Sequence, residues 1–206
     1  MEELVRRALD LVRTIRALVP ERYPLLRLAL PTQILALTSA LILGRIFSVE
    51  RPSFGCEIGL VQAGLVLVLG EAGFLGLFML LRPFAGEMKL PGYLYRLLEA
   101  LRKTTPQDLA ITCALVGFVE EFVFRGILLP LIGMVLSAAV FSAAHRPRAA
   151  FHWLTLAGLA ALFTVEVRYT GGLLVPMIHH ALHDLMALGV LAYVVKNDPD
   201  SSLFTM

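Results

Sequence analysis

The fold is decided by residues 109–145, LAITCALVGFVEEFVFRGILLPLIGMVLSAAVFSAAH. This stretch is apolar almost throughout, and its only acidic, basic or histidine residues are Glu120, Glu121, Arg125 and His145. A helix needs about 20 mainly apolar residues to cross a hydrocarbon core roughly 30 Å thick. The stretch is too long for a single crossing, and it predicts two membrane helices that divide just after Arg125.

Apolar runs of similar length lie on both sides of this stretch. They predict further membrane helices at residues 28–47, 58–81, 149–167 and 172–195. Hydrophobic residues make up 58% of the 206-residue chain and charged residues 17%, against roughly 45–50% and about 25% in a soluble domain. We therefore predict an all-α fold, a polytopic transmembrane helical bundle with about six spans.

The chain divides into four predicted segments. Residues 1–27 place apolar side chains at helical spacing with arginines around the rest of the circumference, which predicts an amphipathic helix at the membrane interface. A soluble helix docked on the bundle is the alternative. Residues 28–81 hold two spans, residues 82–108 form a loop with a short helix around residues 95–101, and residues 109–196 hold the remaining membrane helices.

Basic residues indicate the orientation and the partners. Six arginines precede the first predicted span, and five lysines or arginines lie between Arg82 and Lys103. Because cytoplasmic loops are enriched in Lys and Arg, both termini and this loop are predicted to be cytoplasmic, in the inner (cell) membrane. The formal net charge is only +2, which leaves no broad cationic face for nucleic acid. The lipid bilayer is the expected surrounding, and the sequence does not indicate an oligomeric state.

The first motif holds three charged residues inside an apolar helix. Each such residue costs about 2.5–3.5 kcal/mol on insertion scales, so it needs a partner or a function. Glu121 and Arg125 are four residues apart on one helix face, which suits an ion pair. Glu120 points about 100° away and lacks a local partner, so it is a candidate acid–base catalyst. The alternative is that both acids pair with basic residues on neighbouring helices.

The last predicted span contains three histidines and an aspartate within two turns: His179, His180, His183 and Asp184. Spacing of four residues places His180 and Asp184 on one face, and His179 and His183 on a second face rotated by about 100°. Only one of these pairs can point fully at a given site. Burying four polar groups without partners would cost desolvation free energy and gain nothing for stability, so these four residues indicate a function.

The sequence excludes three common plans for hydrolysis inside a membrane. It contains no HExxH for a zinc protease, no GxSx serine nucleophile with a helix-borne histidine, and no GxGD for an aspartate pair. What remains is a water activated by a carboxylate and a histidine, with other imidazole or carboxyl groups holding the oxyanion. A lone histidine at a helix end, such as His145, more often anchors that end at the membrane interface. The three histidines of the last span favour a catalytic role for His145 instead.

Three motifs together resemble those of the Abi or CPBP family, which contains the type II CAAX prenyl endopeptidases. The motifs are Glu120-Glu121-x-x-x-Arg125, Phe141-x-x-x-His145 and His180-x-x-x-Asp184, and the similarity extends from about Pro106 to Leu188. The resemblance implies an intramembrane protease that cleaves a peptide bond by glutamate-dependent water activation. The catalytic residues that it implies are Glu120, His145, His180 and Asp184. The supporting residues are Glu121, Arg125, Phe141, His179 and His183.

The resemblance implies that Glu120 and His145 activate water and that His180, with Asp184, supports the oxyanion. The family commonly has Asn at the position of Asp184. Because a carboxyl group donates to an oxyanion only when protonated, Asp184 is alternatively expected to orient His180 or His183.

No cofactor is required by this chemistry. Zinc is the alternative, held by Glu120, His145 and His180, and a metal-dependent hydrolase could also use His179 or His183. The expected substrate is a membrane-anchored peptide or protein, either a prenylated carboxy-terminal sequence or another membrane-associated precursor. A rival of another class is a membrane scaffold or immunity protein that binds a partner without cleaving it.

The predicted site also constrains the path between the first two motifs. At about 1.5 Å per residue, a plain hairpin of two full spans would leave Glu120 and His145 at different depths. Gly126, Pro130 and Gly133 can interrupt a regular helix. We therefore predict a break or a short non-spanning helix across residues 126–133, reached by a wet cavity.

Overall fold

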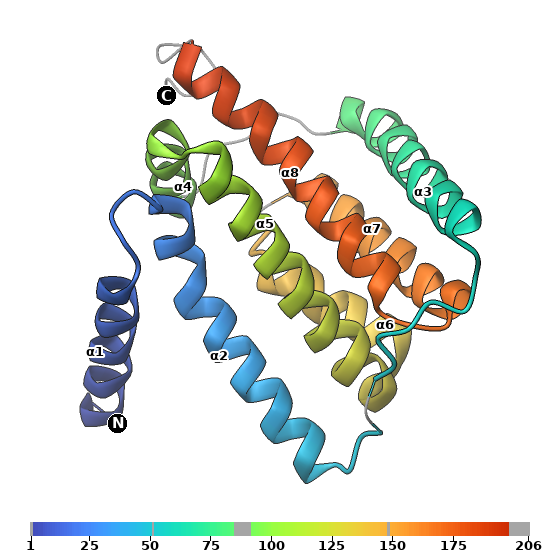
Figure 1. The fold of residues 1–206 in the computed structure, drawn as a ribbon, viewed down its shortest axis with the longest axis horizontal. Coiled ribbons are helices and arrows are strands. Elements are labelled where there is room, and N and C mark those ends of the chain that lie inside the picture. Colours follow the sequence, from blue (N-terminus) through green and yellow to red (C-terminus); the bar gives the residue numbers. More distant parts are fainter. Residues whose placement is uncertain (1, 51, 85–91, 148, 198–206) are drawn as a thin grey trace.

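The structure is a computed structural model that describes residues 2–50, 52–84, 92–147 and 149–197 (Figure 1). These residues contain helices and no strand, so the predicted all-α fold is confirmed. The α-helices are α1 (Glu2–Leu18), α2 (Pro24–Ile46), α3 (Leu60–Leu81), α4 (Gly92–Lys103), α5 (Pro106–Glu121), α6 (Leu129–Ala144), α7 (Ala150–Thr170) and α8 (Leu174–Asn197). A 3-10 turn, η1, covers Arg82–Phe84, and a π-helix, η2, covers Phe122–Leu128.

Five stretches among the described residues are long and apolar enough to cross a membrane, and the chain is an integral membrane protein. They are α2, α3, the run Pro106–Ala144, α7 and α8. The sequence predicted about six spans because it divided Pro106–Ala144 into two. Helix α6 beyond Gly133 extends only from Met134 to Ala144, about 16 Å at 1.5 Å per residue, which is too short to cross.

Gly133 makes the break that lets α6 return beside η2. Its backbone has φ 77° and ψ 172°, a conformation that glycine adopts without the steric cost of a Cβ atom. After the break, the Ser137 hydroxyl donates to the Phe124 carbonyl at 3.0 Å, and the rings of Phe124 and Phe141 pack edge to face. The interruption therefore lies within the predicted 126–133 segment, at its carboxyl end.

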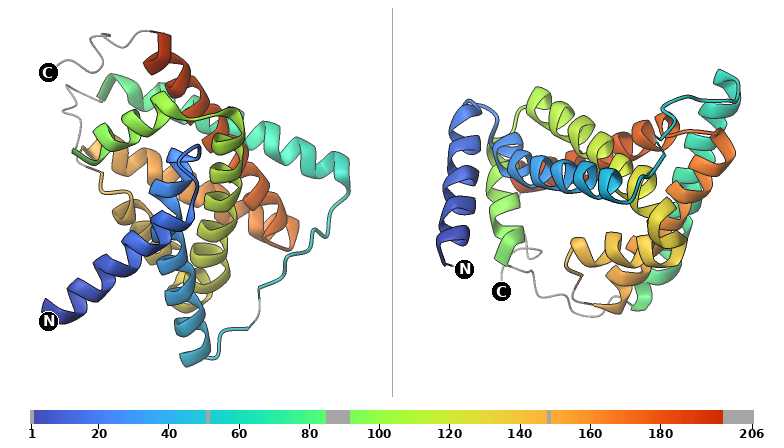
Figure 2. Two further views of the ribbon diagram at one scale, coloured as in Figure 1. Left: turned by 60° about the vertical axis from the view of Figure 1, so that its left-hand side comes forward. Right: turned by 90° about the horizontal axis from the view of Figure 1, so that it is seen from below.

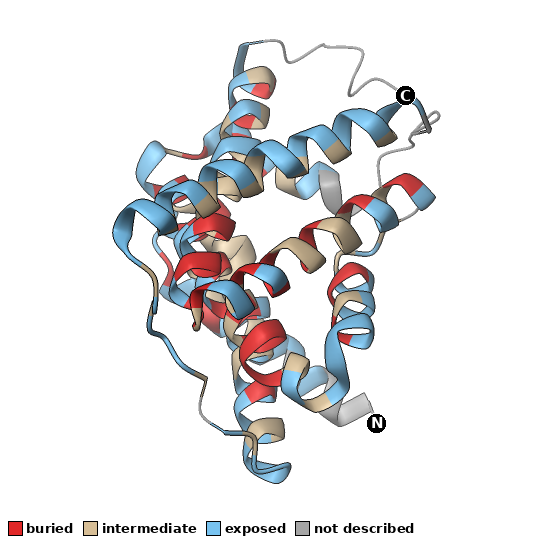
Figure 3. Cartoon of the chain, turned by 90° about the vertical axis from the view of Figure 1, so that its right-hand side faces the viewer, coloured by how far each residue is buried: buried red, intermediate tan, exposed pale blue. Residues whose placement is uncertain are grey.

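Helix α5 lies between α2 and α8 (Figure 1). A Cβ atom at Gly117 would lie 2.8 Å from the Ala181 nitrogen and 2.9 Å from the Met177 carbonyl, so glycine permits the close approach of α5 to α8. Buried residues concentrate on the inner helix faces, while α3 lies at the periphery with no buried residue (Figure 3). Its outer apolar side chains, such as Leu60 at 90% exposure, suit contact with lipid.

Helix α1 projects beside the start of α2, away from the rest of the bundle (Figure 2). Ile15 and the following Val19 are buried, whereas Leu11 and Leu18 are exposed. One apolar edge thus packs against the protein and another remains open. The predicted interfacial location of this helix stays a prediction.

Asp108 fixes the start of α2 from the first turn of α5. Its carboxylate is fully buried and accepts hydrogen bonds from the Leu25 and Leu26 amides at 2.9 and 3.0 Å and from the Thr104 hydroxyl at 2.6 Å. We expect Asp108→Ala to lower the free energy of unfolding in detergent by roughly 1–3 kcal/mol, because it leaves buried donors unpaired. The exposed Asp10→Ala is the control, and equal effects of the two variants would contradict this role.

Candidate active site

The first motif forms a buried ion pair at the junction of α5 and η2. Arg125 Nη1 lies 2.9 Å from Glu121 Oε1, and both side chains are almost completely buried. The second guanidinium nitrogen donates to the Ala160 carbonyl of α7 at 3.0 Å. The guanidinium also lies over the rings of Phe141 and Phe163, at 4.8 and 5.2 Å from their centroids. Arg125 thus connects η2 to α6 and α7.

Glu120 and His145 lie side by side because α6 turns back along η2. Glu120 Oε2 is 3.6 Å from His145 Nε2. This oxygen is buried and accepts no hydrogen bond from any residue that the structure describes. The other carboxylate oxygen lies 3.4 Å from the amide nitrogen of Gln33, on α2. Among the described residues, one oxygen of Glu120 therefore faces Gln33, and the other is an acceptor without a hydrogen bond.

The orientation of the His145 ring follows from its second nitrogen. Nδ1 lies 2.8 Å from the Phe141 carbonyl oxygen, four residues back along α6. A carbonyl only accepts, so Nδ1 carries the proton of this bond. When the ring is neutral, Nε2 then presents a lone pair toward Glu120.

His180 connects the ion pair to Glu120. Its Nδ1 lies 2.8 Å from Glu121 Oε1, the oxygen that also accepts from Arg125. Its Nε2 faces two further carboxylates, Glu120 Oε2 at 3.9 Å and Asp184 Oδ2 at 3.7 Å. The structure therefore brings together all four residues that the motifs imply as catalytic.

His179 and His183 point away from this centre, toward α3 and α7. His179 contacts Glu166 through Nδ1 and Glu71 through Nε2, and His183 contacts Glu71 through Nδ1. The two histidine pairs of α8 thus face different neighbours, as their helical spacing predicts. Neither histidine therefore contributes a donor to the candidate catalytic centre formed by Glu120, His145, His180 and Asp184.

Three residues at these sites were missing from the sequence-predicted set: Gln33, Glu71 and Glu166. Each is a polar residue inside a predicted membrane helix, and such residues are expensive in lipid unless they have a partner. The cost of placing these side chains in lipid was the signal in the sequence that each of them has a partner. Which histidine or carboxylate each one meets depends on how α2, α3 and α7 pack.

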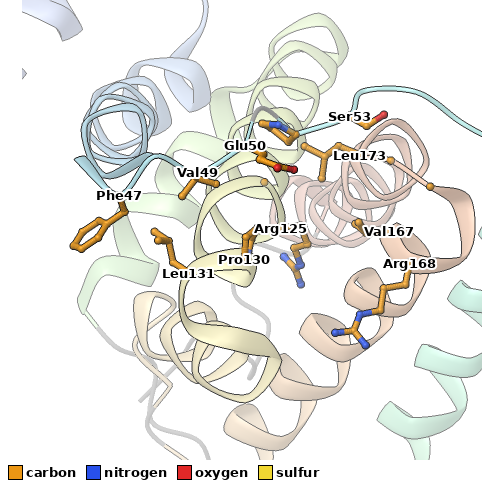
Figure 4. A pocket seen from close by; sticks show the side chains of 14 residues that line it. Phe47, Val49, Glu50, Ser53, Arg125, Pro130, Leu131, Val167, Arg168 and Leu173 are labelled. Atoms are coloured by element: carbon orange, nitrogen blue, oxygen red, sulfur yellow. The ribbon is translucent and has the colours of Figure 1, made fainter. Parts of the chain in front are cut away.

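A cavity of about 630 Å³ reaches the irregular backbone of the η2–α6 segment (Figure 4). Gly126, Pro130 and Leu131 line it, together with Arg125, Arg168 and the loop that follows α2. The cavity thus reaches the 126–133 segment, and its filling by water stays a prediction. Arg125 of the ion pair lines it, whereas Glu120, His145 and His180 of the candidate catalytic centre do not.

The donor atoms of the candidate site bear on the zinc alternative, in which Glu120, His145 and His180 would hold the metal. Within the described ranges, no group of three or more His, Cys, Asp or Glu side chains is arranged to hold a metal ion. At the catalytic centre, the oxygen and nitrogen atoms that face one another are 3.6–3.9 Å apart.

Comparison with known proteins identifies the segment that carries this geometry. Residues 102–186 match the family model described as type II CAAX prenyl endopeptidase Rce1-like. The match is less than half of the chain, but it runs from the end of α4 into α8 and includes all three motifs. No curated protein and no solved structure gives a match. Residues 102–186 are therefore similar to the type II CAAX prenyl endopeptidases of the Rce1-like family.

Proposed function

We propose that this chain is an intramembrane endopeptidase that hydrolyses a peptide bond of a membrane-associated substrate with a water activated by Glu120 and His145. One observation supports this most strongly. Glu120 Oε2 is buried and accepts no hydrogen bond from the described residues, yet imidazole nitrogens lie 3.6 and 3.9 Å away. The family match supports a protease independently of this geometry.

The separation of Glu120 and His145 suits one shared water. At 3.6 Å the two atoms are too far apart for a good direct hydrogen bond, and a polar contact of this length is commonly bridged by a water. In this mechanism the water donates one proton to the Glu120 carboxylate and directs the other at His145 Nε2. As the water oxygen attacks the carbonyl carbon, Glu120 takes its proton and later returns it to the leaving amine.

His180 is assigned to the oxyanion that forms in this step. Its Nδ1 faces Glu121, which is paired with Arg125 and can only accept, so Nδ1 donates. Donation from Nε2 to the oxyanion then requires the doubly protonated ring. Asp184 balances this charge from 3.7 Å. We assign Asp184 to orienting His180, because its carboxylate faces the Nε2 atom of that ring from the same helix face.

The substrate is proposed to approach from the side of His145 and Asp184. These side chains are 35% and 25% exposed, whereas that of His180 is 3% exposed. The family description favours a prenylated carboxy-terminal sequence, and another membrane-anchored precursor is the second possibility. We also propose that both termini lie in the cytoplasm, and the basic residues near the first predicted span and between Arg82 and Lys103 support this orientation.

The test uses the purified full chain in liposomes with three peptides. They are a farnesylated carboxy-terminal peptide, the same peptide without its lipid, and a transmembrane peptide, with products identified by mass spectrometry. The proposal predicts cleavage of at least one lipid-attached or membrane-spanning peptide. Binding of these peptides without a product from any of them would overturn it and favour a scaffold.

The same assay tests dependence on a metal. We expect turnover to persist after treatment with a strong chelator, because Glu120 and His145 can activate water without a Lewis acid. Metal content is measured in parallel by mass spectrometry. Loss of turnover on chelation and its recovery with zinc would show that the metal-dependent mechanism is correct.

A further inference from the structure

A second polar cluster, buried or half-buried, lies beside the proposed catalytic centre, and we call it the histidine clamp. It consists of Glu71 on α3, Glu166 on α7, and His179 and His183 on α8. His179 Nδ1 lies 2.5 Å from Glu166 Oε1, and its Nε2 lies 3.2 Å from Glu71 Oε2. His183 Nδ1 lies 3.0 Å from the same Glu71 oxygen. The side chains of Glu166 and His179 are each only 2% exposed.

The clamp is coupled to the catalytic centre through α8. His179 immediately precedes His180, so the two rings leave the helix about 100° apart. A rotation of α8 that released His179 from Glu166 would also move His180 away from Glu121, which it contacts at 2.8 Å. Fixing His179 therefore fixes the direction of His180.

Helix α7 supports both histidines from one face. The Phe163 ring packs edge-on against His179, with centroids 5.4 Å apart, and stacks on His180 at 5.0 Å and 21°. Three residues before it, the Ala160 carbonyl accepts from Arg125. Three residues after it, Glu166 binds His179. A displacement of α7 would thus reach both the clamp and the ion pair.

Helix α3 closes the clamp through a glycine. A Cβ atom at Gly70 would lie 2.8 Å from Glu166 Oε1 and 2.8 Å from the Cε1 atom of His179, a distance that real Cβ atoms essentially never show. Gly70 therefore lets the backbone of α3 approach closely enough for Glu71 to reach both histidines. At Gly64 and Gly73, on the same helix, a Cβ atom would meet nothing within 4 Å.

We propose that the histidine clamp positions the hydrolytic centre by holding α8 in the rotation that presents His180 to Glu121 and Glu120. Glu71 and Glu166 are positioning residues in this arrangement. The inference rests on the proposed hydrolytic function. Displacing a catalytic group by about 1 Å can cost about 10²-fold in rate, so weakening the clamp lowers kcat and leaves KM nearly unchanged.

The main test compares three glycine variants of α3 in liposomes. Each of Gly70→Ala, Gly64→Ala and Gly73→Ala gains the same helix propensity, but only Gly70→Ala adds an atom against the clamp. We expect kcat to fall by about tenfold to 10²-fold in Gly70→Ala, with KM within about twofold of the wild-type value. A wild-type kcat in Gly70→Ala would overturn the proposal.

Two further variants separate positioning from stability. Glu166→Gln retains an acceptor for His179 and should recover most of the kcat that Glu166→Ala loses. Leu101→Ala, which truncates a fully buried side chain remote from the clamp, gives a destabilised control whose kcat per folded molecule should not change. A fall of kcat in this control to the level of Glu166→Ala would show that general loss of stability explains the result.

A structural measurement keeps the inference testable if the wild-type chain cleaves no substrate. Solid-state NMR of the ¹⁵N-histidine-labelled protein in lipid reports the hydrogen bond of each ring nitrogen, with assignments from single histidine variants. We expect the His180 signals to shift in Gly70→Ala and not in Gly73→Ala. Inactive wild-type protein with that shift would contradict only the hydrolytic function, whereas unchanged His180 signals would contradict the clamp.

Discussion

Glu120→Gln is expected to lower kcat by about 10²–10⁴-fold, the usual contribution of a general acid–base group. The substitution keeps the shape of the side chain and an oxygen that can accept from Gln33. It removes the carboxylate whose second oxygen faces His145 at 3.6 Å. Turnover of a cleaved peptide, measured by mass spectrometry in liposomes, gives the comparison with the wild-type protein.

The matched control for this variant is Glu99→Gln on α4. Glu99 is exposed and pairs with the exposed Lys103, so its loss should leave turnover unchanged. His145→Ala should lower kcat by a similar factor. The Glu120→Gln, His145→Ala double variant should lower kcat little further, because the effects of groups that act as a unit are not additive. Near-wild-type turnover by Glu120→Gln would contradict the assignment of Glu120 as the general base.

Arg125→Ala is expected to destabilise the fold by roughly 3–5 kcal/mol, because removing one partner of a buried ion pair leaves an uncompensated charge on the other. Here the uncompensated group would be Glu121, which is fully buried. The variant also removes the donor to the Ala160 carbonyl and the cation between two aromatic rings. Chemical unfolding in detergent, followed by circular dichroism, measures the change.

The chain offers a matched control for this pair. Lys103 and Glu99 have the same four-residue spacing and lie 3.0 Å apart, but both side chains are more than 60% exposed. Exposed pairs contribute about 0–1 kcal/mol, so Lys103→Ala should have a small effect. Arg125→Lys keeps the positive charge but lacks the two terminal nitrogens of the guanidinium. Its loss of unfolding free energy should lie between those of Lys103→Ala and Arg125→Ala. Similar unfolding curves for Arg125→Ala and Lys103→Ala would refute the structural role of the buried pair.

What the sequence determined by itself was local along the chain. Helical spacing alone predicted that Glu121 pairs with Arg125 and that the two histidine pairs of α8 face different directions. Apolar length alone predicted the membrane helices, with α2 beginning at Pro24 instead of residue 28. These features depend on residues within one or two turns of each other, and helix geometry fixes such neighbours whatever the rest of the fold does.

The partners that polar residues meet on other helices follow from the packing of those helices. The return of α6 after Gly133 brings His145 to Glu120, and helix packing brings Gln33 to Glu120 and Glu71 and Glu166 to His179. These partners are 13 to 108 residues apart in the chain, so no periodicity links them. Close approach of backbones at glycines such as Gly70 and Gly117 permits this packing, which is a property of the packed helices and not of any one helix.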